Sequence, residues 1–451
     1  TKDGLNNINS TTEGTITISG FLTNLQEAKN NLKAKIDELV KANKLTDEQA
    51  NELKNKIDNP DTNSIAKVKE IELEKDKQVL VNEAEKEFNH LNKAQLDDVI
   101  KKIKTADTLE KAQEAKNNGQ TLDDKMAKLD EIVKNYEAKK PLDKYTYASE
   151  TPKNAFDKVI EHAKKLLDKT NATDLGTDNL DNWIGDEETN TKGEIQTKYE
   201  ALDGDIQKAI QEVTNNEYLS PKQKQDLINK LNSLDPNTLE KANDDGTKLT
   251  LNDIKDEISQ IEAVKKAAIN RINAYENLNQ QQKDSYISQI KSSDNDQLET
   301  IENNATTLDN KMLELKQAIK NVKDVPNSSA YQNADKNNKD AFDSALNVAN
   351  KIKNGKETTD PSDTFNYNAS LDEVQSAIDN LKLANTNIKR DEALKYVDNA
   401  PYLGAAEKAS FKEKLNQNPI TDETIAKLKE QAQIINDAKK VYVDQIKAID
   451  N

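Results

Sequence analysis

The residues best suited to acid–base chemistry in this chain are its two histidines, His90 and His162. His90 stands directly before Leu91, at a predicted helix start. His162 lies on a predicted helix, and the matching position of an internal repeat carries Val348. General acid–base catalysis needs a partner group and a cleft around the reacting atoms, and neither position indicates them. We therefore interpret both histidines as structural.

A second candidate is the acidic stretch 178–188 around Trp183, the only tryptophan of the chain. Such a stretch could be a calcium loop or a binding epitope. It does not have EF-hand spacing, because Gly185 in the sixth position would place Leu180 in the first. We favour packing of Trp183 and Ile184 against a local core over ligand contact. The second repeat carries the apolar segment Phe365-Asn366-Tyr367 in the corresponding loop, which supports packing.

Other catalytic signatures are missing from the sequence. It contains no cysteine, which excludes thiol chemistry, Cys-based zinc sites and disulfides. No Walker motif, Rossmann glycine pattern, His-Glu-x-x-His or nucleophile elbow occurs. The carboxylates alternate with lysines along predicted helix faces, which is typical of helix support and solubility. We predict that the protein is not an enzyme and has no catalytic, cofactor-binding or metal-ligating residues; partner-binding residues stay unassigned.

Composition narrows the class of protein further. The chain has 451 residues with 65 basic and 82 acidic side chains, a net charge of −17, which disfavours nucleic acid and anionic membrane surfaces. Its 11 glycines and 9 prolines are too few for a turn-rich β fold. No long uninterrupted apolar run predicts a membrane span. The chain starts at Thr1 without a signal peptide, so we expect an internal piece of a longer polypeptide.

The apolar residues recur with the period of an α-helix along nearly the whole chain. Leu25, Ala28, Leu32, Ile36 and Leu39 follow one another at steps of three, four, four and three positions and form one helical stripe. The alternating segment 15–18 near the start is the one short strand-like exception. The sequence therefore predicts an all-α fold.

A long unit occurs twice, at one constant offset and without a gap over 121–166. It matches Met126 to Met312, Tyr145 to Tyr331, and Ala-Phe-Asp at 155–157 to the same residues at 341–343. Each copy predicts three helices: about 122–136, one over 155–166, and about 193–213 in the first copy; about 308–322, one over 341–352, and about 371–383 in the second. The polar loops 168–192 and 354–368 precede the third helix. Because Met126 and Met312 fall on the apolar stripe, we expect them in the core.

A shorter unit occurs five times, as a Leu followed by apolar residues 8 and 12 positions later. Each opening Leu precedes a helix-start signal with Glu or Gln three positions after the capping residue. The copies are Leu45/Leu53/Ile57, Leu91/Val99/Ile103, Leu219/Leu227/Leu231, Leu278/Tyr286/Ile290 and Leu403/Phe411/Leu415. A further helix is expected after each copy, as at Leu109 and Leu239, both inside an identical Thr-Leu-Glu-Lys-Ala.

The units follow one another with few Pro or Gly linkers, so the last helix of one can continue as the first of the next. We expect an elongated tandem array of three-helix bundles with shared or continuous helices between modules, about 200 Å long at 1.5 Å per helical residue. The expected boundaries are an irregular segment 1–21, short units 22–74 and 75–120, a long unit 121–206, short units 207–255 and 256–306, a long unit 307–387, a short unit 388–438, and the start of a further helix over 439–451.

These repeats resemble two known module families. Met312, Leu315 and Ile319, then Tyr331-Gln332-Asn333-Ala334-Asp335, then Ala341-Phe342-Asp343 and Ala345 resemble a FIVAR module. The short unit resembles a GA module, notably from Leu45-Thr46-Asp47-Glu48-Gln49 to Ile57 and from Leu219-Ser220-Pro221 to Leu231. Alternation of the two types over residues 22–438 is typical of the giant staphylococcal extracellular-matrix-binding proteins. In the first long unit, Tyr147-Ala148-Ser149 replaces Asn333-Ala334-Asp335.

The resemblance implies a rod-like adhesin at the bacterial cell surface or cell wall, with a role in virulence. It implies a monomer that binds a host matrix protein, fibronectin foremost, by multivalent contacts. One alternative is a non-binding stalk of a giant surface protein. Another is binding of serum albumin, which GA modules elsewhere bind through a partly apolar face around the second helix. An adhesin predicts an exposed apolar or aromatic cluster, with Tyr145, Tyr147, Tyr331 and the Trp183 loop as positions to examine; a spacer predicts an evenly polar surface.

Overall fold

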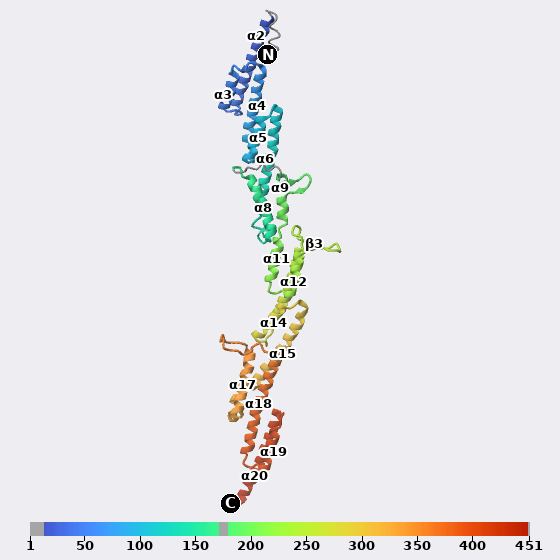
Figure 1. The fold of residues 1–451 in the computed structure, drawn as a ribbon. Helices are drawn as coiled ribbons and strands as arrows, with labels where there is room; N and C mark the ends of the chain where they lie inside the picture. Colours follow the sequence, from blue (N-terminus) through green and yellow to red (C-terminus); the bar gives the residue numbers. More distant parts are fainter. Residues whose placement is uncertain (1–12, 171–178, 450–451) are drawn as a thin grey trace. The chain divides into compact units, whose positions relative to one another are not determined.

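The computed structural model of the chain describes residues 13–170 and 179–449, with side chains described from residue 20 onward. Figure 1 shows its helices and strands, coloured along the sequence from blue to red. Internal contacts divide the chain into two units. The first unit comprises residues up to 211 together with 234–248, and the second comprises 212–233 together with the residues from 249 onward. Both units consist almost entirely of helices, as the apolar periodicity predicts.

The first unit contains two short repeat units followed by a long one. Its elements are α2 (Glu13–Lys41), α3 (Asp47–Asp58), α4 (Ile65–Glu87), α5 (Lys93–Thr105), α6 (Leu109–Glu137), α7 (Asp143–Thr146), α8 (Glu150–Leu167), α9 (Leu180–Ile184), β1 (Gly185–Asp186), β2 (Thr191–Lys192), α10 (Glu194–Glu200) and β3 (Glu240–Ala242). Helix α11 (Gly204–Asn215) and strand β4 (Lys248–Thr250) each continue across the division between the units.

The second unit contains short, long and short repeat units in that order. Its elements are α12 (Pro221–Asn232), α13 (Leu251–Ala274), α14 (Gln280–Ser292), η1 (Asn295–Gln297), α15 (Leu298–Val322), η2 (Val325–Asn327), α16 (Ser329–Asn333), α17 (Lys336–Asn354), α18 (Leu371–Asn399), α19 (Ala405–Leu415) and α20 (Asp422–Ile449).

The capping signals of the short units form as the sequence predicts. At the start of α3, the Thr46 hydroxyl accepts a hydrogen bond from Gln49 N, and the Gln49 side chain accepts one from Thr46 N. Asn92, Ser220 and Asn279 make the same reciprocal pair at α5, α12 and α14. At α19 the capping residue is Gly404, so only Glu407 contributes, accepting from Gly404 N. These bonds satisfy donors that a helix start would otherwise leave without a partner.

Shared helices connect the modules within each unit, which confirms the expected architecture. Helix α6 packs against α4 and α5 over its first half and against α8, α9 and α10 further on. Helix α18 likewise contacts α15, α16 and α17, and also α19 and α20. One continuous apolar core therefore runs from Leu80 to Leu202 through two modules, and another runs from Ala268 to Ile388. Met126 and Met312 lie fully buried in these cores, as predicted.

The start of the second helix in three short units is also covered by the module that follows. The Asn92 amide donates to Leu166 O at 3.0 Å, and the Asn279 amide donates to Ile352 O at 2.7 Å. The Ser220 hydroxyl donates to Asp294. Capping residues therefore serve two purposes, since they close a helix and also hold the next module.

Three expectations about helix boundaries are wrong. The alternating segment 15–18 lies within α2, so helix replaces the irregular segment expected over 1–21 from Glu13 onward, while residues 1–12 lie outside the described chain. The single helix expected over 193–213 is interrupted after Glu200 and resumes at Gly204. Here Asp203 accepts hydrogen bonds from both the backbone N–H and the hydroxyl of Ser149. The "start of a further helix" over 439–451 is the continuation of α20 up to Ile449.

A fourth wrong expectation concerns the repeated Thr-Leu-Glu-Lys-Ala. At 108–112 the Thr108 hydroxyl caps α6, as predicted. At 238–242 the same five residues lead into strand β3, and Leu239 has a positive φ of 56°. The turn formers that follow decide the difference, because Gly246 takes a φ of 84° and Asp245 accepts hydrogen bonds from the Thr247 N–H and hydroxyl.

One position on the third helix of every short unit contacts the Gln or Glu of the capping signal. The contacting residue is Asn82, Met126, Lys265, Met312 or Lys439. Lys265 is fully buried, and its ammonium donates to Gln223 Oε1 at 3.1 Å and to Lys291 O at 3.0 Å. Burial lowers the pKa of Lys265 from 10.5 to about 8.

Two other short repeats have methionine at the position of Lys265, namely Met126 and Met312. Lys265→Met should raise the free energy of unfolding of the second unit by about 1 to 3 kcal/mol at pH 7, because it replaces a buried charge with an apolar side chain of similar length. Between pH 8 and 10.5 the unfolded chain binds more protons at Lys265 than the folded chain, so the stability of the natural protein rises with pH. The advantage of Lys265→Met should therefore shrink over that interval. Thermal unfolding of both proteins at pH 7 and pH 9.5 measures this; an advantage that does not change with pH would contradict it.

Within the described residues, no helix combines the length and the apolar character that crossing a membrane requires.

Candidate functional site

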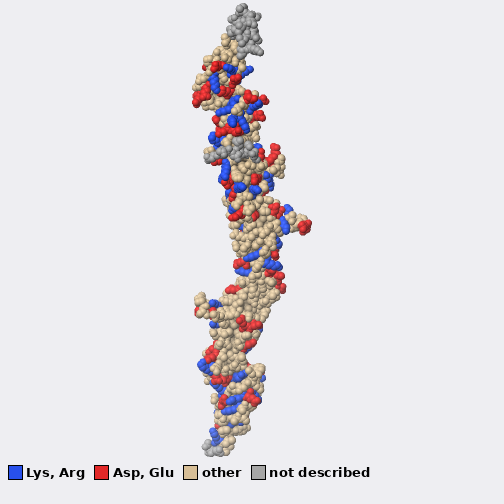
Figure 2. All heavy atoms as spheres, viewed as in Figure 1, with Lys and Arg blue, Asp and Glu red and all other residues tan. Residues whose placement is uncertain are grey.

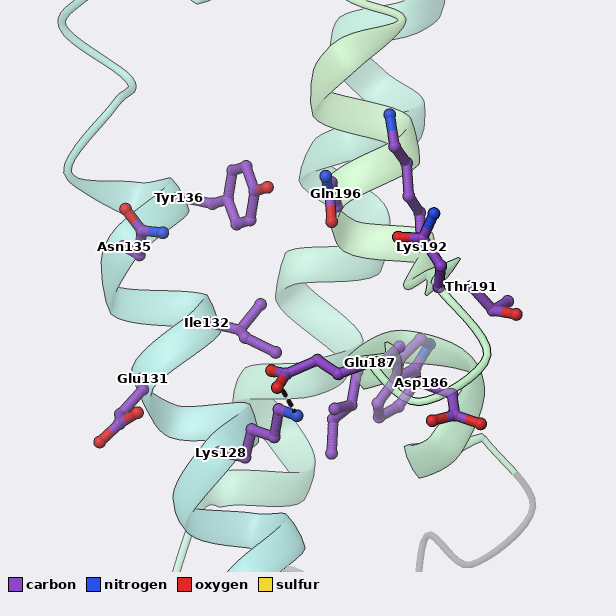
Figure 3. A pocket seen from close by; sticks show the side chains of 13 residues that line it. Lys128, Glu131, Ile132, Asn135, Tyr136, Asp186, Glu187, Thr191, Lys192 and Gln196 are labelled. Atoms are coloured by element: carbon purple, nitrogen blue, oxygen red, sulfur yellow. Dashed lines mark ion pairs between the residues drawn. The ribbon is translucent and has the colours of Figure 1, made fainter.

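The described surface has a groove on the first long unit, beside the chain's only tryptophan (Figure 3). It has a volume of about 550 Å³ and lies between α6, the segment from α9 to β2, and the start of α10. Its lining combines apolar and charged side chains: Lys128, Glu131, Ile132, Asn135, Tyr136, Trp183, Ile184, Asp186, Glu187, Asn190, Thr191, Lys192 and Gln196.

Local sequence explains why the Trp183 segment folds onto α6. Leu180 and Trp183 share one face of the short helix α9 and are buried in the core of the long unit, where Ile184 is partly buried. Gly185 ends α9 with a φ of 79°, which favours glycine. A Cβ on Gly193 would collide with the backbone of Trp183 and Ile184, so only glycine permits this approach. The structure therefore agrees with the packing role expected for Trp183 and Ile184.

A hairpin forms the outer wall of the groove. Strands β1 and β2 pair antiparallel, with Gly185 opposite Lys192 and Asp186 opposite Thr191. The Asp186 carboxylate accepts hydrogen bonds from the Thr189 hydroxyl at 2.8 Å and from Glu188 N at 2.9 Å, and these bonds lower its pKa. Asp186 is thus held as a carboxylate that orders the turn.

Ion pairs connect the hairpin and the neighbouring α9 to the helices below them. Lys128 on α6 lies 2.9 Å from Glu187 on the hairpin, as the dashed line in Figure 3 shows. Lys125 pairs with Asp181 at 2.7 Å. Lys192 pairs with Glu200 at 2.7 Å, which lowers the pKa of Glu200. Because these pairs are exposed, each adds little to stability, but together they set the position of the groove wall.

The floor of the groove is partly aromatic. Tyr136 packs against Tyr199 with ring centroids 5.1 Å apart, and burial raises the pKa of Tyr136. The side chains of Ile132, Tyr136 and Gln196 face one another across the space between α6 and α10 (Figure 3). A shallow surface with apolar side chains at its centre and charges of both signs at its rim suits contact with a polypeptide.

The groove lining does not have the arrangement that catalysis needs. None of its side chains pairs a nucleophile with a base at hydrogen-bond distance within the described residues. In the part of the chain that the structure describes, no group of three or more His, Asp or Glu side chains could hold a metal ion.

Of the candidates from the sequence, only the Trp183 stretch lines the groove, and the others lie apart from it. His162 is exposed on α8, and His90 stands at the turn before α5, with its Nδ1 3.0 Å from Asp123 Oδ2. Tyr145 and Tyr331 each donate a hydroxyl hydrogen bond to the carboxylate of an aspartate on the following long helix, Asp157 or Asp343. Both rings also stack edge-on against a buried phenylalanine. Tyr147 is 40% exposed and does not line the groove.

Sequence reasoning missed a set of buried carboxylates that hold interhelical turns. Asp123 accepts hydrogen bonds from His90 N and Leu91 N, and Asp309 accepts them from Asn277 N and Leu278 N. The two aspartates occupy matching positions of the long repeat, so the internal repeat contained the signal. They resemble the many exposed carboxylates in sequence, and only burial distinguishes them.

Comparison with family models identifies the class. The model of the GA module matches residues 70–125, 199–235, 259–311 and 384–438. The model of the FIVAR domain matches residues 125–185 and 311–389. The chain is a tandem array of GA modules and FIVAR domains, and the groove lies mainly on the first FIVAR match.

Proteins of Staphylococcus aureus have a similar sequence. "Extracellular matrix-binding protein ebh" of strain MRSA252 is 24% identical over 362 residues, which is 80% of this chain and 3% of the relative. "Extracellular matrix-binding protein EbhA" of another strain is also 24% identical over 80% of this chain, here 4% of the relative. This chain thus spans only a few per cent of the length of these relatives. A crystal structure of an EbhA domain from the same species aligns with 68% of this chain and 98% of its own, at 18% identity and a TM-score of 0.25.

Proposed function

We propose that this chain is a segment of a bacterial cell-surface adhesin that binds a host extracellular-matrix protein, with fibronectin as the first candidate. The observation that carries the proposal is the similarity, over 80% of the chain, to proteins named for matrix binding. That similarity also supports an extracellular location at the cell surface or cell wall and a role in virulence. We include the segment 22–74 in the proposal as a fifth GA-like module, beside the four that the family model matches. Its helices α2, α3 and α4 pack around a core of their own.

We place the contact in the groove beside Trp183. The hairpin at the end of the first FIVAR match forms one wall of the groove, and the second long unit has the irregular segment 355–370 at the corresponding position of its sequence. A shallow groove supports modest affinity per contact, so useful attachment would come from several modules or several chains acting together.

Two alternatives have specific support. A non-binding stalk fits the face drawn in Figure 2, where acidic and basic side chains of the described residues lie interspersed and neither sign gathers in one large patch. Albumin binding by GA modules fits best at α3, because the start of this helix lines an open groove of about 620 Å³ with Asn82 and Lys86. In α5, α12 and α14 the same end is covered by the following module.

The experiment that tests the proposal is binding of the purified chain to immobilised fibronectin and serum albumin, side by side at physiological salt. The adhesin proposal expects saturable binding to fibronectin. Binding to albumin alone would favour the second alternative and direct attention to α3. Absence of binding to either protein at tens of micromolar would favour the stalk for this segment.

A matched pair of double variants tests the groove. Glu131→Lys with Asn135→Arg places two long cations, one turn apart on α6, at the edge of the groove, and should weaken fibronectin binding at least about tenfold, or about 1.4 kcal/mol. Glu114→Lys with Asn118→Arg makes the same substitutions at the same spacing on the same helix, away from the groove, and should leave binding within about twofold. Equal loss in both variants would indicate a general effect of charge and remove the groove from the proposal.

A further inference from the structure

A second cavity, in the other unit of the chain, differs in character from the groove. It has a volume of about 380 Å³ and lies where the second FIVAR domain meets the last GA module, between α16, α18 and α20. Val325, Ala330, Ile425 and Ala426 supply apolar lining. This cavity can therefore accept an aliphatic chain.

One polar atom of the cavity lining has no hydrogen-bond donor within the described residues. Asn385 lines it, and its Oδ1 is buried without a hydrogen-bond partner in the described structure. Lys389 pairs with Asp422 at 2.5 Å, and Lys429 pairs with Glu392 at 3.2 Å. The lining also includes Glu430, so its carboxylates outnumber its ammonium groups by three to two. A buried acceptor and an excess of negative charge favour a cationic donor.

The first FIVAR domain has a cationic donor, the ammonium of Lys144, at its junction with the next GA module. At the offset that matches Met126 to Met312, Lys144 corresponds to Ala330. The Lys144 ammonium donates to Leu202 O at 3.0 Å and to Pro236 O at 2.9 Å, and burial lowers its pKa. Pro236 belongs to the loop after the second helix of the next GA module, as Gln417–Thr421 does in the second unit. A lysine side chain therefore bridges the FIVAR domain and that loop in the first copy.

In the first copy, close backbone contacts also fill the junction between the FIVAR domain and the next GA module. A Cβ on Gly204 would collide with the carbonyl oxygens of Asp143 and Lys144, so this helix start packs directly against α7. In the second copy Glu392 stands beside α16 instead, and its carboxylate accepts a hydrogen bond from the Ser329 hydroxyl at 3.3 Å. The cavity is therefore present in the second copy, where Ala330 replaces Lys144 and where Glu392 lies beside α16 in place of a direct backbone contact.

We propose that the cavity at the junction of the second FIVAR domain and the last GA module binds a lysine side chain of a partner polypeptide. The aliphatic part of that lysine packs against Val325, Ala330 and Ile425. Its ammonium donates to Asn385 Oδ1 and to the surrounding carboxylates. The partner thus supplies a lysine side chain at the junction where the first copy has Lys144. This site is separate from the Trp183 groove and does not depend on fibronectin binding.

The test uses the full chain with 13C-labelled alanine methyl groups and the small molecule Nα-acetyl-lysine N-methylamide. Saturable shifts of the Ala330 and Ala426 methyl signals are expected, with a dissociation constant of about 1 to 10 mM, as is reasonable for one side chain. The norleucine analogue has a similar aliphatic chain without the ammonium, and should bind at least about tenfold more weakly.

Two variants complete the test. Ala330→Lys places the lysine within the chain and should abolish the shift of Ala426, while methyl signals elsewhere stay unchanged. Asn385→Leu keeps the side-chain volume, removes the acceptor, and should weaken binding about tenfold. Equal binding of the lysine and norleucine compounds, or no shift up to about 20 mM, would overturn the proposal. Because no fibronectin is present, these outcomes are independent of the adhesion experiment.

Discussion

Replacing Leu383 with proline is expected to lower the free energy of unfolding of the second unit by about 3 kcal/mol or more. Leu383 lies near the middle of α18 and is 53% exposed, so its side chain contributes little packing. Proline removes a backbone donor and clashes with the carbonyl of the preceding turn. Because the FIVAR domain and the last GA module both pack on α18, the damage should reach both of them.

Hydrogen exchange followed by mass spectrometry can locate this effect. Amides of α17, in the FIVAR domain, and of α19, in the GA module, should both lose protection in Leu383→Pro. Leu383→Ala keeps the helix and should change stability by no more than about 0.5 kcal/mol. Loss of protection in only one of the two modules would show that α18 does not couple them.

The second large effect is expected from Asp309→Ala. Asp309 Oδ1 accepts hydrogen bonds from Asn277 N at 2.9 Å and Leu278 N at 3.0 Å, and Oδ2 accepts one from the Asn277 side chain at 2.9 Å. Asp309 is only 9% exposed, so the backbone donors lose a partner that water replaces poorly. We expect a loss of about 3 kcal/mol, because the buried N–H of Leu278 and the partly buried N–H of Asn277 each lose an acceptor, at about 1 to 3 kcal/mol for a buried group.

Two controls make the result specific, with urea unfolding followed by circular dichroism as the measurement. Asp309→Asn keeps an oxygen that can accept both backbone hydrogen bonds, and should lose less than half as much stability. Asp324→Ala removes an exposed aspartate near the end of the same helix and should change stability by about 0.5 kcal/mol or less. If all three variants behaved alike, the turn would not depend on the buried hydrogen bonds.

Much of the fold could be predicted from the sequence because its signals are local. The stripe from Leu25 to Leu39 lies on α2, and the capping signals at Thr46, Asn92, Ser220 and Asn279 start helices at the expected residues. The constant offset between its two copies identified the long unit and placed Met126 and Met312 in its core. Helix periodicity and capping depend on neighbours within one or two turns, so a single sequence contains them. The elongated form and its length stay a prediction.

The candidate sites depended on contacts between distant residues, and the sequence indicated them only in part. The Trp183 loop was recognised as a packing segment, but its groove also requires Ile132 and Tyr136, which lie far earlier in the chain. The tyrosines chosen as candidates for exposure, Tyr145 and Tyr331, bind their own carboxylates instead. No spacing rule connects such residues, because their proximity results from how the helices pack.

The sequence by itself determined the helices, their caps and the order of the repeats, since these follow from residue types a few positions apart. Only the tertiary structure decided what identical or equivalent residues do. Thr-Leu-Glu-Lys-Ala starts α6 at one place and enters β3 at another. Equivalent positions hold Met126 in an apolar core and a fully buried ammonium at Lys265. The physical reason is that burial, hydrogen-bond partners and local charge are set by packing across the chain, and these quantities determine whether a side chain stabilises, connects modules or binds a partner.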